Sequence, residues 1–425
     1  MAIWDQGVAT AVANGDFERL ESSVRSYSRV YGQVFERARG PYVYDRDGRE
    51  YIDMLCSAGA LSYGHNDPHI KAAVIDYLQS DGVTSSLDLY TTAKLRFLRK
   101  FQDVVLAPRS LEYRVQCCGP TGTDAVEAAL KLARKVTGRQ AVVAFTNAYH
   151  GVSLGSLAAT AGEHERGAAG VPLEHVVRAP FDGFLGDGID TVTVIEAMFG
   201  AGGGLPRPAA FLLETIQAEG GLNVASPRWL RRIAELAARL GALLIVDDVQ
   251  VGCGRSGRFF SFERAGIEPD IVCLSKAIGG MGMPMALALI RPAIDVWAPG
   301  EHVGTFRGNN LAFVAATAAL DYWTTPEFIG RIEQNAHTMR ARLGTIAQCF
   351  PGVEVRGLGM IQGIALPEPA QARAAIAQAF SRGLILESAG ARRNVLKILP
   401  PLTIEPDELA KGLDILATAV SLVRH

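Results

Sequence analysis

Short apolar runs alternate with helix-like patterns from about residue 60 to residue 320, and few folds accept such a sequence. The helix-like stretches repeat apolar residues at helical spacing, as at Val126, Leu130 and Ala133. The apolar runs lie at 113–116, 141–145, 210–214, 242–248, 270–275 and 286–290. Continuous apolar strands between helices predict an α/β fold with a mostly parallel sheet covered by helices on both faces.

The N-terminal sixty residues predict an arm that ends in a β-hairpin. Residues 1–40 are polar and indicate an arm with helical stretches. Asp47-Gly48 then lies between two strand-like runs, Val43-Tyr44 and Tyr51-Ile52. Glycine accepts the positive φ that a tight reversal needs, so this pattern favours a hairpin turn.

The last hundred residues differ in pattern from the middle of the chain. An alanine-rich helix is expected at 311–323, a strand pair at 353–366, and an amphipathic helix after 400–404. We therefore predict a large domain and a smaller α+β domain. The predicted parts are 1–60 (arm and hairpin, contributing to the small domain), 61–315 (large domain) and 316–425 (small domain).

Charge and cysteine content exclude several classes of protein. The formal charge is −2, so no global basic field recruits nucleic acid or a membrane surface. The apolar stretch 285–290 is too short to cross a bilayer, and the N-terminus lacks a secretory pattern, which favours the cytoplasm. The six cysteines form no C-x-x-C pair, so we expect buried thiols, with no metal site and no disulfide framework.

Two polar residues stand where predicted strands end. Asp247 follows the apolar run 242–246, and ligands in open α/β sheets bind at the carboxyl ends of strands. Lys276 follows the run 270–274 and precedes the glycine-rich turn 277–284. A partly desolvated amine has a lowered pKa, which suits imine formation. Taken singly, a structural carboxylate and an ordinary lysine would explain both residues.

Two further signals belong to the same chemistry. Gly122 and Thr123 lie at the start of a predicted helix, where free N–H groups and the helix dipole attract anions, although an ordinary cap has the same pattern. Tyr149 follows another strand and offers an aromatic face to a planar ring. A phosphate site, an aromatic face, a carboxylate and a lysine are together the groups that pyridoxal phosphate requires.

The sequence resembles the class III (fold type I) aminotransferases over essentially the whole chain. The segment 247–257, the pair Ser275-Lys276 and the segment 302–306 are its specific parts. Within that class, 119–139 and 299–313 look most like the diaminobutyrate–2-oxoglutarate transaminases.

This resemblance implies a role for each matching residue. Lys276 would carry pyridoxal 5'-phosphate as a Schiff base and act as the general base, and Asp247 would keep the pyridine nitrogen protonated. Thr305 would reach the phosphate of the neighbouring subunit's cofactor, which implies a homodimer or higher homo-oligomer with shared active sites. The other implied cofactor contacts are Gly122, Thr123, Tyr149 and Gln250.

The resemblance also implies an amino-acid substrate and an oxo-acid substrate. Glutamate would donate the amino group and aspartate 4-semialdehyde would accept it, giving 2,4-diaminobutyrate. Many members hold carboxylates with an arginine paired to a glutamate. Glu219 matches that glutamate, whereas Lys397 stands at the arginine position and lacks the bidentate fork. Arg307 is a second candidate clamp, or else a structural arginine.

Other substrates and other enzyme classes are also compatible with the sequence. The segments 85–91, at the expected mouth of the site, and 278–284 differ from the pattern expected of the subfamily, so another ω-amino acid is an alternative substrate. The same fold and lysine also serve racemases and aminomutases. Intact Lys276 and Asp247 argue against a protein that has lost catalysis. A nicotinamide oxidoreductase is disfavoured because no G-x-G-x-x-G opens a helix after a strand.

Overall fold

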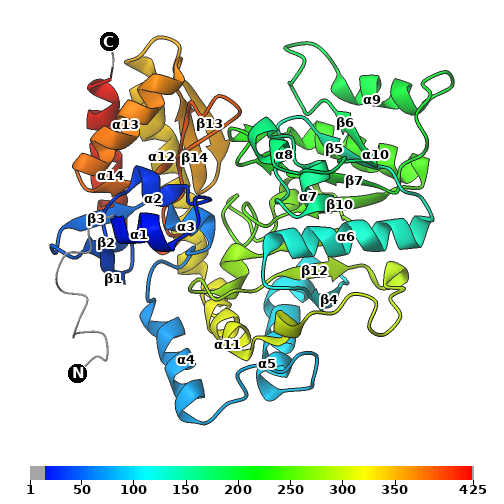
Figure 1. Ribbon diagram of the computed structural model, residues 1–425, viewed down its shortest axis with the longest axis horizontal. Helices are drawn as coiled ribbons and strands as arrows, with labels where there is room; N and C mark the ends of the chain where they lie inside the picture. Colours follow the sequence, from blue (N-terminus) through cyan, green and yellow to red (C-terminus); the bar gives the residue numbers. More distant parts are fainter. Residues whose placement is uncertain (1–14, 424–425) are drawn as a thin grey trace.

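The computed structural model describes residues 15–423, so the predictions for residues 1–14 lie outside the described part of the chain. A seven-stranded sheet forms one side of the molecule (Figure 1). In spatial order its strands are β4 (Arg114–Cys117), β12 (Leu287–Ile290), β11 (Ile271–Leu274), β10 (Leu243–Asp247), β7 (Ala210–Leu213), β5 (Val142–Phe145) and β6 (Val176–Ala179). Strand β12 runs opposite in direction to the other strands of this sheet, which are parallel to one another. The mostly parallel α/β sheet is thus confirmed.

Side chains alternate between the two faces of this sheet, and each face has its own hydrophobic core. In β5, Val143 and Phe145 belong to one cluster, whereas Val142 and Ala144 belong to the other. Helix α10 (Pro227–Leu240) covers the first face with Trp229, Leu230 and Ile233. Helix α6 (Gly122–Thr137) covers the second face with several alanines together with Val126 and Leu130.

All six predicted apolar runs form strands, but β6 was not predicted. Its sequence, VVRA, contains Arg178 and is short. The Arg178 guanidinium donates to the carbonyl oxygen of Phe145 on β5, at 3.1 Å, so a tertiary contact accommodates the charge at this edge strand. Sequence patterns do not encode such a contact.

A second sheet and its helices form the opposite side of the molecule. The predicted strand pair at 353–366 is confirmed as β13 (Glu354–Leu358) and β14 (Ile361–Ala365). These strands continue into β17 (Val395–Ile398) and β16 (Glu387–Ala389), all antiparallel. Helices α12 (Pro326–Gln348), α13 (Pro369–Ser381) and α14 (Pro406–Ser421) pack around them (Figure 1).

Helix α11 (Asn310–Ala319) connects the two sides of the molecule. Ala312 and Phe313 pack in the core of the large sheet, whereas Ala315 and Ala318 pack in the C-terminal core. The helix begins one residue before the predicted 311–323 segment and ends four residues earlier. The domain boundary at residue 315 stays a prediction.

The N-terminal segment joins the C-terminal side (Figure 1). The predicted hairpin is confirmed by β2 (Tyr42–Asp45) and β3 (Glu50–Asp53), with Gly48 at φ +78° in the turn. The strand β15 (Leu384–Ile385) pairs in parallel with β3. One expectation was wrong in part, because Phe35–Arg39 of the predicted arm forms strand β1, which pairs with β2.

The remaining elements connect these layers. They are α1 (Gly15–Leu20), α2 (Tyr27–Val30), α3 (Cys56–Gly59), α4 (Pro68–Gln79), α5 (Thr92–Phe101), α7 (Leu154–Ala159), α8 (Glu163–Gly167), α9 (Thr191–Phe199), β8 (Ile216–Gln217) and β9 (Asn223–Val224). Of the described helices, none combines the length and the apolar character needed to cross a membrane. Four of the six cysteine side chains are buried, whereas Cys117 is half-buried and Cys349 lies at the surface.

Candidate active site

A cavity of about 1080 Å³ lies at the carboxyl ends of β5, β10 and β11. Segments of the C-terminal side, around β16, and of α2 form its opposite wall. The residues predicted from the sequence that line it are Gly122, Thr123, Tyr149, Glu219, Asp247, Gln250 and Lys276. The fold therefore brings to one cavity residues that are spread over about 150 positions of the chain.

Lys276 lies directly beyond β11 in a short turn with a left-handed backbone. Its φ is +52°, a conformation that non-glycine residues rarely adopt and that is concentrated at functional sites. The Ser275 hydroxyl donates to the carbonyl oxygen of Met285 at 2.8 Å and fixes the start of the turn. Burial lowers the pKa of Lys276, although the nearby Glu219 carboxylate opposes this shift. A lowered pKa increases the fraction of neutral amine, which is the nucleophilic form.

Asp247 is the last residue of β10 and is held by two hydrogen bonds. Its Oδ2 lies 2.7 Å from Nδ1 of His150, and its Oδ1 accepts from the backbone N–H of Val249 at 3.1 Å. The His150 side chain is fully buried. Sequence reasoning missed His150 and selected only its neighbour Tyr149. The available signal was a histidine at the carboxyl end of a predicted strand, the edge where Asp247 also emerges.

The start of α6 forms an open cradle of backbone N–H groups. The side chain of Thr121, the residue before the helix, caps no N–H group, because its hydroxyl donates to Oδ2 of Asp124 at 3.1 Å. Within residues 15–423, no hydrogen bond occupies the N–H of Gly122 or of Thr123. A Cβ on Gly122 would lie 2.7 Å from Cγ1 of Val249, so any larger residue there would force Val249 to move. Open donors at a helix N-terminus fit a phosphate group.

Tyr149 is held at the cavity wall by its backbone. Its N–H donates to Oε1 of Glu214 at 2.9 Å, and Oε2 of the same carboxyl accepts from Ala218 at 3.2 Å. Burial raises the pKa of Glu214, and the charge of Asp247 adds to that effect. The aromatic side chain of Tyr149 lines the cavity.

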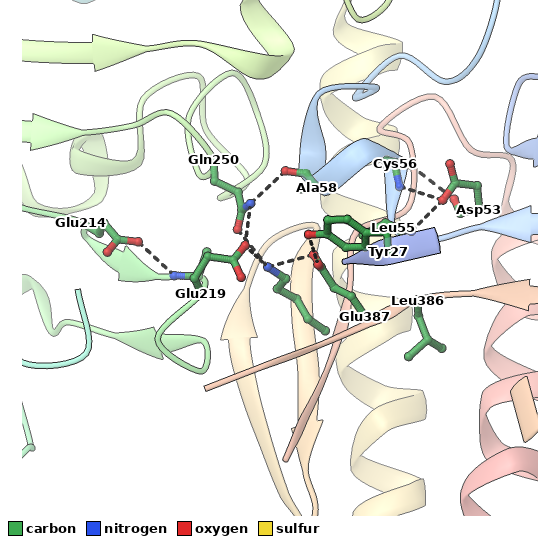
Figure 2. A network of polar contacts seen from close by, with 12 residues as sticks. Tyr27, Asp53, Leu55, Cys56, Ala58, Glu214, Glu219, Gln250, Leu386 and Glu387 are labelled. Carbon is green, nitrogen blue, oxygen red and sulfur yellow. Dashed lines mark hydrogen bonds and ion pairs between the residues drawn. The ribbon is translucent and has the colours of Figure 1, made fainter. Parts of the chain in front are cut away.

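Behind Glu219 and Gln250 lies a buried polar network (Figure 2). Nζ of Lys397 donates to Oε1 of Glu219 at 2.6 Å and to Oε1 of Gln250 at 3.2 Å. It also lies 3.0 Å from Oε1 of Glu387, its direct cross-strand partner between β16 and β17. The Tyr27 hydroxyl donates to Oε2 of Glu387 at 2.9 Å. The expected pairing of Glu219 with Lys397 is thus present in the structure.

Thr305 and Arg307 are not brought to this cavity. Both lie in the turn 305–308, where the side chain of Thr305 is exposed. The Arg307 guanidinium donates to the carbonyl oxygen of His302 at 3.3 Å. The segment 85–91, expected at the mouth, also lies outside the cavity and pairs with the turn through Ser85 and Asn309.

Comparison with known proteins agrees with this geometry. The model of the family "Aminotransferase class-III" matches residues 24–420. The chain belongs to the class-III aminotransferases. It is 50% identical over 407 residues to the diaminobutyrate–2-oxoglutarate transaminase of Oceanobacillus iheyensis, covering 95% of each chain. It is 51% identical over 409 residues to the enzyme of the same name from Nocardia farcinica, covering 96% of this chain and 94% of that one.

The fold of this class-III aminotransferase also matches solved structures. The ornithine aminotransferase of Toxoplasma gondii superimposes with a TM-score of 0.85 at 26% identity, over 97% of this chain and 96% of that one. Another structure of that enzyme has pyridoxal phosphate at its active site. Class-III aminotransferases use this cofactor, and the open N–H groups of α6, the Asp247 carboxylate and the Lys276 amine fit it. The chain is a pyridoxal-phosphate-dependent transaminase.

Proposed function

We propose that this transaminase moves an amino group between glutamate and aspartate 4-semialdehyde, with 2-oxoglutarate and 2,4-diaminobutyrate as the products. The observation that carries the proposal is the 50% identity, over nearly the whole chain, to diaminobutyrate–2-oxoglutarate transaminases.

Each cavity residue has a proposed task. Bound pyridoxal phosphate supplies an electron sink for the substrate carbon that loses a proton. Lys276 would hold the cofactor covalently and would move that proton, for which its lowered pKa suits it. Asp247, held by His150, keeps a proton on the ring nitrogen. Gly122 and Thr123 would donate to the phosphate, Tyr149 would cover the ring, and Gln250 would lie near the ring hydroxyl.

We also propose a homodimer in which each chain completes the site of its partner. Thr305, the expected phosphate contact, lies outside the cavity of its own chain and is exposed. It lies within a surface formed by 85–91 and 303–309, which are joined by the bridge between Ser85 and Asn309. Large apolar side chains are exposed there: Leu87, Leu89, Tyr90, Val303 and Phe306. Such a patch is typical of an interface.

Mixing two inactive variants tests the shared site. Lys276→Ala chains and a Thr305 variant shown to be nearly inactive alone should together recover roughly a quarter of wild-type activity after subunit exchange. The reason is that random exchange places half of the chains in mixed dimers, each with one intact site. Activity is measured after a brief denaturing exchange at equal concentrations. No recovery despite proven exchange would mean that each chain builds its site alone.

The substrate pair is tested by steady-state kinetics with a panel of ω-amines. With 2-oxoglutarate as acceptor, we expect kcat/KM for 2,4-diaminobutyrate to exceed the values for ornithine and 4-aminobutyrate by about tenfold or more. One misplaced charge-assisted contact costs about that much. The substrate assignment fails if ornithine or 4-aminobutyrate is faster by a similar factor, and the transaminase assignment is unaffected by that result.

A further inference from the structure

The carboxyl groups and the basic groups that line the cavity are strongly unequal in number. Its carboxyl side chains are Glu163, Glu165, Glu214, Glu219, Asp247 and Glu387. In the part of the chain that the structure describes, the only lysine or arginine side chains lining it are Lys276 and Arg393. In the proposed function Lys276 binds the cofactor covalently, so it is not available to pair with a substrate carboxylate. A substrate with two carboxylates still needs a cation, because an unpaired carboxylate inside such a wall is costly.

Lys397 does not meet this need, because three oxygens of the chain already surround its ammonium group. An ammonium group has three donors, and three oxygens lie within 3.2 Å of its Nζ, from Glu219, Gln250 and Glu387. Its side chain is 0% exposed and does not line the cavity. Burial would lower the pKa of Lys397, but the two carboxylates outweigh burial and raise it. Lys397 with its two carboxylates carries one net negative charge.

Arg393, by contrast, stands at the cavity wall with its charge accessible. It lies in the turn between β16 and β17, where its backbone N–H donates to the carbonyl oxygen of Gly390 at 2.8 Å. The N–H of Gly390 donates in turn to the carbonyl oxygen of Glu219 at 2.8 Å, which ties this turn to the cavity wall. Arg393 has φ +53°, a left-handed conformation that is uncommon for a side-chain-bearing residue.

The partner of Arg393 comes from the other side of the molecule. Nη2 of Arg393 lies 3.5 Å from Oε1 of Glu165, which belongs to α8 beside the large sheet. The two side chains are 58% and 22% exposed. A long, partly solvated ion pair contributes little stability, so an incoming carboxylate can replace Glu165 at low cost. The guanidinium fork suits a carboxylate better than an ammonium group does.

We infer that Arg393 binds the substrate carboxylate remote from the reacting amine, and that Glu165 occupies Arg393 until that carboxylate arrives. This inference rests on the proposed function for the choice of glutamate and 2,4-diaminobutyrate as substrates. It makes Arg393 a specificity-determining residue that accounts for how a cavity lined with carboxyl groups accepts dicarboxylates. It also assigns the carboxylate contact to a residue other than Lys397 and Arg307.

The test compares three arginine variants in the holoenzyme. Arg393→Gln removes the proposed contact, and Arg307→Gln removes the competing candidate. Arg392→Gln is the matched control, because Arg392 is the adjacent residue, is 61% exposed and pairs with Glu368 away from the cavity. Substrates are used in pairs with and without a carboxylate: 2,4-diaminobutyrate with 1,3-diaminopropane, and ornithine with 1,4-diaminobutane. Glutarate serves as an unreactive dicarboxylate whose Kd is measured by calorimetry.

Arg393→Gln should raise KM for glutamate and 2,4-diaminobutyrate, and the Kd of glutarate, by about tenfold to a hundredfold, with kcat nearly unchanged. KM for the diamines and all constants of Arg392→Gln should stay within about twofold of wild type. Glu165→Gln, which frees Arg393, should lower KM for glutamate.

Unchanged glutarate binding in Arg393→Gln would overturn the inference, as would an equal rise in KM for the diamines or a larger effect of Arg307→Gln. If wild type prefers ornithine, the proposed substrate fails. The comparison of ornithine with 1,4-diaminobutane, and the Kd of glutarate, still test whether Arg393 binds the substrate carboxylate.

Discussion

Replacing Lys276 with alanine should lower turnover by roughly a thousandfold or more. The change removes both the covalent anchor and the group that carries the proton, and each loss alone costs orders of magnitude. The left-handed turn at Lys276 and the bond from Ser275 to Met285 place the amine in the cavity, and no other lysine lines that cavity within residues 15–423. A nearby lysine therefore cannot substitute for it.

Borohydride reduction of the wild-type holoenzyme followed by peptide mapping measures the attachment directly. The pyridoxyl group should be found on Lys276, and the alanine variant should bind the cofactor without a covalent link. Lys411→Ala is a suitable control, because Lys411 pairs with Glu50 at the surface, with 55% of its side chain exposed. A label on a different lysine, or near-normal turnover of Lys276→Ala, would refute the assignment.

Asp247, Lys276 and Gly122 share one property, which is a local signal in the sequence, whereas Glu219 and Gln250 were implied only by the family resemblance. Asp247 and Lys276 each follow a continuous apolar run, and Gly122 opens a helix with clear periodicity. A strand followed by a polar residue is visible in a short window, and the parallel topology then brings such strand ends together. These positions could therefore be predicted without knowledge of any long-range contact.

The positions that were missed depend on pairing between distant segments. His150 contacts Asp247 across 97 positions of the chain, and Tyr27 contacts Glu387 across 360. Glu387 faces Lys397 only through the register of β16 and β17, and a shift of one residue would separate them. Arg393 stands in a polar turn that looks like ordinary surface in the sequence. Strand β1 likewise forms because β2 is available to pair with it.

The second large effect is expected for Asp247→Asn. The amide keeps the size of the side chain but removes the negative charge that stabilises a proton on the cofactor's ring nitrogen. We expect kcat to fall by about a hundredfold or more, the scale of a removed electrostatic stabiliser. The absorbance of the bound cofactor should change as well, because the protonation of the ring changes. The carboxylate in wild type is fixed by His150 and Val249, so the charge is held in place before the substrate binds.

Asp248→Asn is the matched control for this experiment. Asp248 is the next residue and is equally buried, but its carboxyl group accepts hydrogen bonds from Ser261 and does not line the cavity. Burial raises the pKa of Asp248 to about 7, so near neutral pH it is already partly uncharged, and the amide replaces it with little change of charge. If the loss at Asp247 reflected damage to the end of β10, Asp248→Asn would lose activity too. Equal losses, or an Asp247→Asn enzyme with full activity and an unchanged spectrum, would show that the charge of Asp247 does not act on the ring.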